Sequence, residues 1–390
     1  MTKQTATNKS WKLVDCRNGI ASDQLSIDQT QSGVPGIAFE YRRLRGGLSD
    51  GVDILEVTNG DLRCTLLPTR GMGIWKSWLG DFELGWKSPV RGPVHPQFVP
   101  WNEPSGLGWL DGFDELLVRC GLSSNGGPVF DDLGRLVWPL HGRIANLPAH
   151  KLDVTVDRER GEIMVRGVVD ECRFHFAKLR LTSTWITRVG EPGYRVIDEV
   201  TNLSDSPGEM QLLYHCNVGE PLLHPGSQVS LPYRTMAPQN GTAVEGLNRW
   251  NQYGPQTACK AEQCYYFEPL AAEDGQTVVL LHDANKQRGV SLSFPIEQLP
   301  YFILWKNETS SADGYVTGLE PAINFPNPRT VEKRHGRVRT IGPHETLRFE
   351  LQIQMLTEPA AIAATQSKID AIQSQQQPTV HQQPRPEWSP

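Results

Sequence analysis

The stretch Asp53-Ile-Leu-Glu-Val-Thr-Asn-Gly-Asp-Leu-Arg-Cys-Thr-Leu66 contains two short runs rich in apolar and β-branched residues, separated by a turn signal. The turn signal is Asn59-Gly60, and this pair tolerates the positive φ angles of a type I′ turn. The stretch therefore predicts a β-hairpin, with strands over residues 53–57 and 62–66.

Similar runs recur along the rest of the chain and predict a succession of antiparallel strands. They cover residues 152–156, 162–169, 179–186, 194–200, 210–215, 277–282, 290–294 and 346–355. A long segment rich in glycine, proline and tryptophan, residues 84–148, lies between them. Long irregular segments in compact folds usually serve function, so we expect this one to line a cleft.

The size and composition of the chain favour an all-β protein with a large core. The 390 residues are enough for two domains but do not require them, because all-β units often exceed 200 residues. Hydrophobic residues make up 38% of the chain, and 36 glycines and 29 prolines imply frequent turns.

Charge and cysteine usage argue against several classes of function. The formal net charge of -6 provides no basic surface for nucleic acid or for a membrane. The seven cysteines are scattered and include no Cys-x-x-Cys pair, which disfavours a disulfide framework or a structural zinc site. We find neither a leader segment nor a spanning helix in the sequence, and we expect a soluble cytoplasmic protein.

Three remote segments offer groups for proton transfer. Glu320 lies in Gly318-Leu-Glu-Pro-Ala-Ile-Asn-Phe-Pro-Asn327, where prolines predict a constrained turn. His215 follows a predicted strand, and His141 lies between Pro139 and Gly142. A histidine exchanges protons near neutral pH, and burial would raise the pKa of a carboxylate toward the range of a general base. Each could instead be structural: a strand histidine bonded to backbone, a loop histidine and an exposed turn glutamate.

Other residues could contact a ligand. Arg70 precedes a Gly-x-Gly and could hold a hydroxylated or anionic group, or else form a surface ion pair. Trp305, Lys306 and Tyr315 could supply a platform and anchors, while Trp86, Trp101 and Trp109 could stack on sugar rings or belong to the core.

Motifs for other chemistries are missing from the sequence. It contains no Gly-x-Ser-x-Gly elbow, phosphate-binding loop or dinucleotide fingerprint, so we predict no cofactor. His215, Glu220 and His224 could ligate a metal, but their spacing fits no known zinc pattern, and we predict no metal site.

Six strings, in this order, resemble the galactose mutarotase-like superfamily, and specifically an aldose 1-epimerase-like family catalogued mostly as a domain of unknown function. They are Leu67-Pro-Thr-Arg-Gly-Met72, Leu84-Gly-Trp-Lys-Ser-Pro89, residues 112–121, Leu140-His-Gly-Arg-Ile-Ala-Asn-Leu-Pro148, Leu213-Tyr-His-Cys-Asn217 and Gly318-Leu-Glu-Pro321. The characteristic Asn-His-x-Tyr-Phe-Asn of better-known mutarotases is replaced here by Tyr214-His-Cys-Asn-Val-Gly219.

The resemblance implies one antiparallel β-supersandwich over residues 35–357, with an open sugar-binding cleft across one sheet. An N-terminal extension, residues 1–34, would precede it. A C-terminal helix, residues 358–374, is expected after it, because Ile362, Ile369 and Ile372 fall on one face behind a proline. The Gln/Pro-rich residues 375–390 are predicted to be disordered.

The resemblance also implies roles for individual residues. His215 would be the general acid and Glu320 the general base of an aldose 1-epimerase that interconverts sugar anomers. Substrate contacts are predicted for Arg70, His141, Arg143, Asn217 and Lys306. Two alternatives stay open: a sugar-binding or sensing protein without turnover, and another carbohydrate isomerase or lyase on the same scaffold.

Overall fold

Two large β-sheets face each other in a computed structural model that describes residues 8–390. The ten-stranded sheet has the order β17 (Gln228–Ser230), β20 (Gln276–His282), β21 (Gly289–Pro295), β25 (Thr346–Leu356), β15 (Gly193–Asn202), β14 (Lys178–Arg188), β13 (Glu162–Cys172), β12 (Lys151–Asp157), β1 (Lys9–Asp15) and β2 (Ile20–Ala21). All its pairings within the described residues are antiparallel.

The second sheet contains fourteen strands and carries the candidate site. Its main order is β26 (Thr379–Val380), β18 (Tyr233–Pro238), β19 (Gln263–Pro269), β22 (Tyr301–Asn307), β23 (Val316–Ala322), β16 (Gly208–Gly219), β9 (Leu117–Leu122), β7 (Gly73–Leu79), β6 (Leu62–Leu67), β5 (Asp53–Asn59), β4 (Ile37–Arg43) and β3 (Gln24–Ile27). Two short strands complete it: β24 (Arg339–Ile341) pairs with β16, and β8 (Phe82–Leu84) pairs with β7.

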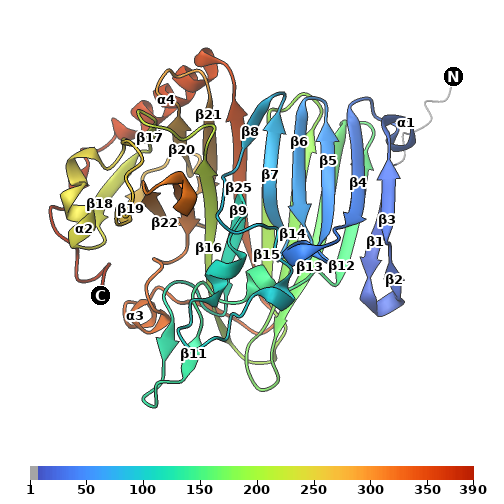
Figure 1. Cartoon of the computed structure of the whole chain (residues 1–390), viewed down its shortest axis with the longest axis horizontal. Helices are drawn as coiled ribbons and strands as arrows, with labels where there is room; N and C mark the ends of the chain where they lie inside the picture. Colours follow the sequence, from blue (N-terminus) through green and yellow to red (C-terminus); the bar gives the residue numbers. More distant parts are fainter. Residues whose placement is uncertain (1–7) are drawn as a thin grey trace.

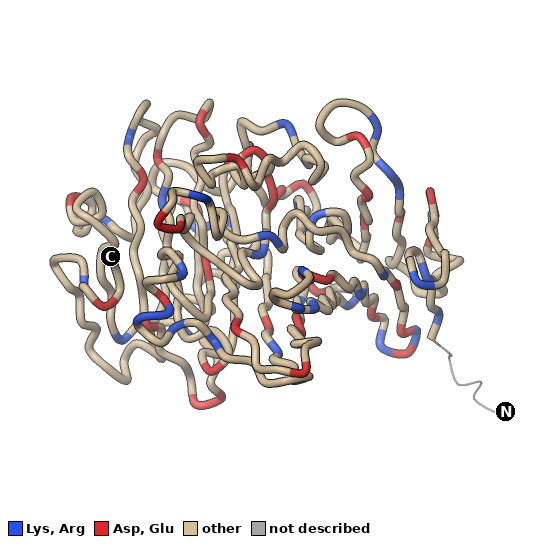
Figure 2. The backbone as a smooth tube through the Cα atoms, turned by 90° about the horizontal axis from the view of Figure 1, so that it is seen from below, with Lys and Arg blue, Asp and Glu red and all other residues tan. Residues whose placement is uncertain are grey.

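The remaining elements lie outside the two sheets. β10 (Val129–Phe130) and β11 (Leu136–Trp138) form a hairpin at the lower edge of the view in Figure 1. The α-helices within residues 8–390 are α1 (Gln29–Ser32), α2 (Gly241–Glu245), α3 (Arg329–Arg334) and α4 (Pro359–Gln373). Acidic and basic residues are interspersed along the chain (Figure 2).

The predicted strands are confirmed, including the hairpin formed by β5 and β6. Gly60, in the turn between them, has a φ of 60°, as the Asn-Gly signal requires. The alternation of buried and less buried residues along β12 shows why such runs form strands: every second side chain enters the core between the sheets.

Residues along β16 alternate between two environments, and this alternation positions the site. Leu212, Tyr214 and Cys216 belong to the core between the sheets. Leu213 belongs to a second cluster, with Trp109 and other side chains of the long segment before β12. The odd-numbered residues of β16 therefore point to the outer face of the fourteen-stranded sheet, which that segment covers.

A buried ionic network ties β16 to the opposite sheet. Arg119 on β9 pairs with Asp198 on β15, and both side chains are almost inaccessible to solvent. The Tyr214 hydroxyl donates to Asp198 (2.9 Å), and Arg119 also donates to the Ser183 hydroxyl of β14 (2.7 Å). Because every charge has a partner, the network satisfies the condition for burying ions in an apolar core.

The ends of the chain differ in part from the sequence predictions. The helix after the sandwich is confirmed as α4, which packs Ile362, Ile369 and Ile372 against the outside of β20. Residues 9–27 are not a separate extension, because β1 and β3 add strands to the two sheets. Residues 1–7 of the predicted extension lie outside the described residues.

The prediction of disorder for residues 375–390 is wrong. β26 pairs in parallel with β18 at the edge of the sheet. Trp388 is 5% exposed and packs on Phe325, with ring centroids 5.0 Å apart. The Asn327 side-chain amide donates to the Trp388 carbonyl (2.7 Å). A single buried indole and edge pairing order this segment, and composition alone does not predict such anchoring.

We expect Trp388→Ala to release the C-terminal segment, because deletion of a buried tryptophan side chain typically costs roughly 3–5 kcal/mol. Limited proteolysis with mass spectrometry would detect faster cleavage within residues 375–390. Gln383→Ala is the matched control, because Gln383 is exposed in the same segment. Equal cleavage rates in the wild type and Trp388→Ala would contradict the anchoring role.

Candidate functional site

His215 and Glu320 meet on the outer face of the fourteen-stranded sheet. They lie on the adjacent antiparallel strands β16 and β23, whose register aligns Cys216 with Leu319 and so sets the two side chains opposite each other. The His215 Nε2 and Glu320 Oε1 atoms are 3.2 Å apart. His215 is 6% exposed and Glu320 2%. The fold therefore brings these two residues together, as expected from the sequence.

The local backbone differs from the sequence expectation. Glu320 lies within β23 rather than in a turn, and β16 continues four residues beyond His215. Gly318 explains why a glycine precedes the glutamate: a Cβ added there would lie 2.2 Å from Glu320 Oε1 and 3.1 Å from His215 Cε1. The absence of a side chain at 318 makes room for the pair.

Asn217 fixes the tautomer of His215. On a strand, residues i and i+2 share a face, and Asn217 Oδ1 lies 2.6 Å from His215 Nδ1. The amide nitrogen of Asn217 donates to the carbonyls of Glu115 (2.9 Å) and His215 (3.2 Å), so Oδ1 is the acceptor. His215 Nδ1 therefore carries hydrogen, and in the neutral ring the bare Nε2 faces Glu320.

Burial shifts the proton affinities of the pair in opposite directions. Loss of solvent raises the pKa of Glu320 well above its ordinary value, with a further contribution from nearby Glu262. The same effect lowers the pKa of His215 to about 4, while the hydrogen bond to Asn217 opposes the shift. Burial thus favours the uncharged forms of both groups, in which the pair carries one proton, on Glu320.

His141 lies beside the pair. Its ring centroid is 5.6 Å from that of His215 and 4.6 Å from that of Trp109, and Nδ1 lies 3.3 Å from Asn125 Oδ1. A backbone φ of 55° turns the loop sharply at this residue, just before Gly142. Burial, with a contribution from His215, lowers the pKa of His141 to about 3, so the ring is neutral at physiological pH.

Three aromatic side chains surround His215, and we call them the aromatic cover: Trp109, Phe113 and Trp305. Their ring centroids lie 6.2, 5.2 and 5.5 Å from that of His215. Trp109 and Phe113 come from the segment before β9, and Trp305 comes from β22. The sequence suggested Trp109 and Trp305 as ligand platforms. It gave no signal for Phe113, because a single phenylalanine in an irregular segment has no periodic context.

Arg70 is buried and bonded to groups of the protein itself. The guanidinium is 2% exposed and donates to Glu115, Asn146 and the carbonyls of Val94 and Gly112. The Glu115 carbonyl in turn accepts from Asn217. Arg70 thus anchors the chain segment that holds Asn217, and the predicted direct contact with a sugar does not fit this arrangement.

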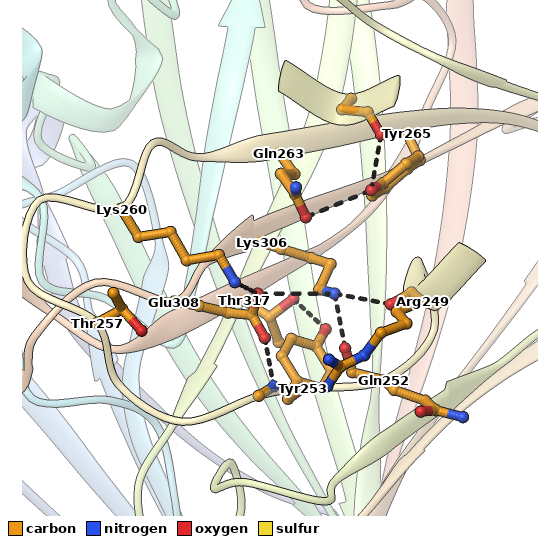
Figure 3. Close-up of polar contacts among 12 residues, drawn as sticks. Arg249, Gln252, Tyr253, Thr257, Lys260, Gln263, Tyr265, Lys306, Glu308 and Thr317 are labelled. Carbon is orange, nitrogen blue, oxygen red and sulfur yellow. Dashed lines mark hydrogen bonds and ion pairs between the residues drawn. The ribbon is translucent and has the colours of Figure 1, made fainter. Parts of the chain in front are cut away.

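Lys306 points away from His215. Its neighbour Trp305 faces the site, so alternation along β22 turns Lys306 to the other face. Its ammonium donates to the carbonyls of Arg249 (3.1 Å) and Gln252 (2.7 Å) and lies 4.9 Å from the Tyr253 ring centroid (Figure 3). Burial lowers the pKa of Lys306 to about 8. The predicted substrate contact does not fit this position.

The other predicted residues contact protein groups other than His215 and Glu320. Arg143 stacks over Trp101, with Cζ 4.3 Å from the ring centroid, and borders a separate cavity. Trp86 is buried and donates to the Glu115 carbonyl, which makes it part of the core. Tyr315 is also buried, with its hydroxyl bonded to the Gly254 carbonyl.

No group of histidines, cysteines and acids within residues 8–390 is arranged to hold a metal ion. Glu220 instead pairs with Lys87, and His224 Nδ1 lies 3.0 Å from the Pro225 carbonyl. All seven cysteines are free thiols. In the same residues, no helix combines the length and the apolar character needed to cross a membrane.

A comparison with known protein families shows to which family the chain belongs. Residues 49–355 match the family model described as Domain of unknown function (DUF4432). The chain belongs to this family. None of the curated proteins searched matches it.

Solved structures extend the comparison. A "putative aldose 1-epimerase" from Klebsiella pneumoniae subsp. pneumoniae MGH 78578 is 34% identical, with a TM-score of 0.94 over 97% of this chain and 99% of that one. A galactose mutarotase-like protein from Clostridium acetobutylicum is 14% identical, with a TM-score of 0.57 over 83% of this chain and 99% of that one. A protein with the same description as the first, from Escherichia coli K12, is 13% identical, with a TM-score of 0.50 over 79% of this chain and 100% of that one.

These neighbours establish the galactose mutarotase-like fold and confirm the resemblance read from the sequence. The structures from Clostridium acetobutylicum and Escherichia coli, at 14% and 13% identity, support the fold alone, because one fold hosts many reactions.

We expect Arg70→Met to destabilise the protein by about 3–5 kcal/mol, because Glu115 would remain buried without its partner. Denaturant unfolding would measure the change, and Arg45→Met is the control, since Arg45 is an exposed arginine. Addition of Glu115→Leu to Arg70→Met should recover part of the loss. Unchanged stability combined with weaker sugar binding in Arg70→Met would show instead that Arg70 acts on the ligand.

Proposed function

We propose that this protein is an aldose 1-epimerase, an enzyme that interconverts the α and β anomers of a free sugar. The observation that carries the proposal is the buried pair His215–Glu320, 3.2 Å apart on the outer face of the sheet. An acid and a base at that separation can exchange protons with two oxygen atoms bonded to the same carbon, namely the ring oxygen and the anomeric hydroxyl of a sugar. The described neighbours named for this activity share the fold.

The proposed reaction needs one acid and one base. Glu320 removes the proton of the anomeric hydroxyl while protonated His215 donates a proton from Nε2 to the ring oxygen, which opens the ring. The freed carbonyl group rotates about its bond to the next carbon, and closure with the roles reversed gives the other anomer. Every proton taken up is returned, so the pair ends in its starting state.

The single proton of the pair suits this cycle. Burial favours its position on Glu320 in the free protein, and transfer to His215 creates the base and the acid together without proton exchange with solvent. The hydrogen bond from His215 Nδ1 to Asn217 stabilises the imidazolium that forms. Sugar hydroxyl groups between the two side chains would replace part of the solvation that burial removed and so favour the charged pair.

Access of a sugar requires movement of the aromatic cover. His215 and Glu320 are almost closed off from solvent, and Trp109, Phe113 and Trp305 surround His215. The apolar ring faces of these side chains can pack against the C–H face of a pyranose. The imidazole of His141 can form a hydrogen bond with a sugar hydroxyl group. In the proposal His141 binds the sugar and does not exchange protons with it.

Glu320→Gln and His215→Gln should each lower kcat by roughly 10²–10⁴-fold, because each removes one proton-transfer group. Anomer equilibration, followed by NMR or polarimetry over a panel of freshly dissolved sugars, measures the effect. His335→Gln is the control, since His335 is an exposed histidine at the C-terminal end of α3. Full activity in Glu320→Gln would remove the carboxylate from the mechanism. Sugar binding with no anomerisation in the wild type would favour a binding protein.

The dependence of kcat/KM on pH should be bell-shaped. Activity falls below the pKa of about 4 for His215, because a second proton then occupies the pair and no base is left. It also falls above the raised pKa of Glu320, where the pair has lost its only proton and no acid is left. A profile with an acid limb at the ordinary histidine value, near 6.5, would contradict the buried one-proton pair.

A further inference from the structure

A large cavity opens on the other side of the loop that carries His141. Its volume is about 1120 Å³, and it lies between the β10–β11 hairpin, the segment around Trp101 and the end of β13. The volume is at the upper end of the range for small-molecule sites and exceeds the need of one pyranose. His215 and Glu320 do not line it, whereas Arg143, two residues after His141, does.

The acidic side chains of this cavity already have hydrogen-bond donors. Glu171 accepts from the backbone of Leu122 and Ser123 and from the Ser123 hydroxyl. Asp131 pairs with Arg135 and accepts from the backbone of residues 133 and 135. Within the described residues, Asp131 forms its ion pair with Arg135, Glu171 is bonded to neutral donors only, and neither carboxylate forms an ion pair with Arg143 or Arg173.

Two arginines of the same cavity have no acidic partner among the described residues. The side chain of Arg143 forms neither an ion pair nor a hydrogen bond there, and its buried Nε atom is without an acceptor. Arg173 is exposed, and its guanidinium lies over the ring face of Phe176, with Cζ 4.3 Å from the centroid. Aromatic faces hold a guanidinium in place but leave its in-plane donors open.

We propose that this cavity binds the anionic group of an acidic sugar, a carboxylate, sulfate or phosphate, through Arg143 and Arg173. Guanidinium groups recognise such anions by paired charge-assisted hydrogen bonds, and an anion would supply the acceptors that the protein does not. Trp101 and Trp138 at the cavity wall offer faces for the sugar rings. That the ligand is a sugar rests on the proposed function, whereas the preference for an anion rests on the cavity alone.

Calorimetric titration with three probes tests the preference: digalacturonic acid, glucose 6-phosphate and the neutral disaccharide lactose. We expect at least one acidic probe to bind ten-fold or more tightly than lactose. Arg143→Gln and Arg173→Gln should each weaken that binding by roughly ten-fold or more, as expected for a hydrogen bond to a charged group. Arg143→Lys should retain part of the affinity, and Arg45→Gln should retain all of it.

Cys172 reports the location of the bound probe. This exposed free thiol lines the cavity, whereas the exposed Cys16 and Cys259 do not. Alkylation of Cys172 should be slowed by the acidic probe, with the other two thiols unaffected. Absence of binding by both acidic probes, equal binding of lactose, or unchanged affinity in both arginine variants would overturn the proposal.

The two proposals fail separately. Binding is measured in Glu320→Gln as well as in the wild type, because the cavity does not include Glu320. Acidic binding that depends on Arg143, in a protein without anomerase activity, would retain the cavity and reject the reaction. Anomerase activity without any acidic preference would do the reverse.

Discussion

The buried network of Arg119, Asp198 and Tyr214 is the interaction on which the arrangement of the site depends. It joins β9 and β16 of one sheet to β15 of the other in a region that is otherwise apolar. A one-residue slip of β16 would bring His215 into the core in place of Tyr214 and would leave Asp198 without its hydroxyl donor. The cost of burying unpaired charge therefore fixes the register of the strand that carries His215.

A second buried ion pair also positions the site residues. Arg70 and Glu115 hold the segment before β9, and the Glu115 carbonyl accepts from Asn217. Asn217 orients the His215 ring, which presents Nε2 to Glu320. The orientation of His215 thus depends on a chain of hydrogen bonds that runs from Arg70 through Glu115 and Asn217, all of them buried.

Much of the fold could be predicted from the sequence, because strands show a period-two pattern of apolar residues and Asn-Gly marks a hairpin turn. It also placed His215 and Glu320 in one site, through strings that resemble a family. It did not show that Arg70 and Lys306 donate to groups of the protein itself, since residue type does not reveal what a long side chain contacts. Alternation along β22 could have shown that Trp305 and Lys306 face opposite ways, and alternation along β16 could have placed Asn217 beside His215.

Other features of the structure could not be predicted from the sequence. The order of residues 375–390 depends on one buried tryptophan and on a strand pairing of two residues, both of which require the finished sheet. The cavity beside Arg143 is made by segments distant in sequence, so only the folded chain shows that two guanidinium groups without acidic partners share it.

The most direct measurement of the central claim is a crystal structure of the wild-type protein with a sugar that it binds. We predict that the ring oxygen and the anomeric hydroxyl of one sugar lie within hydrogen-bond distance of His215 Nε2 and the Glu320 carboxylate, with Trp109, Phe113 or Trp305 against the ring. A sugar bound on another surface, with His215 and Glu320 still in contact with each other, would contradict it.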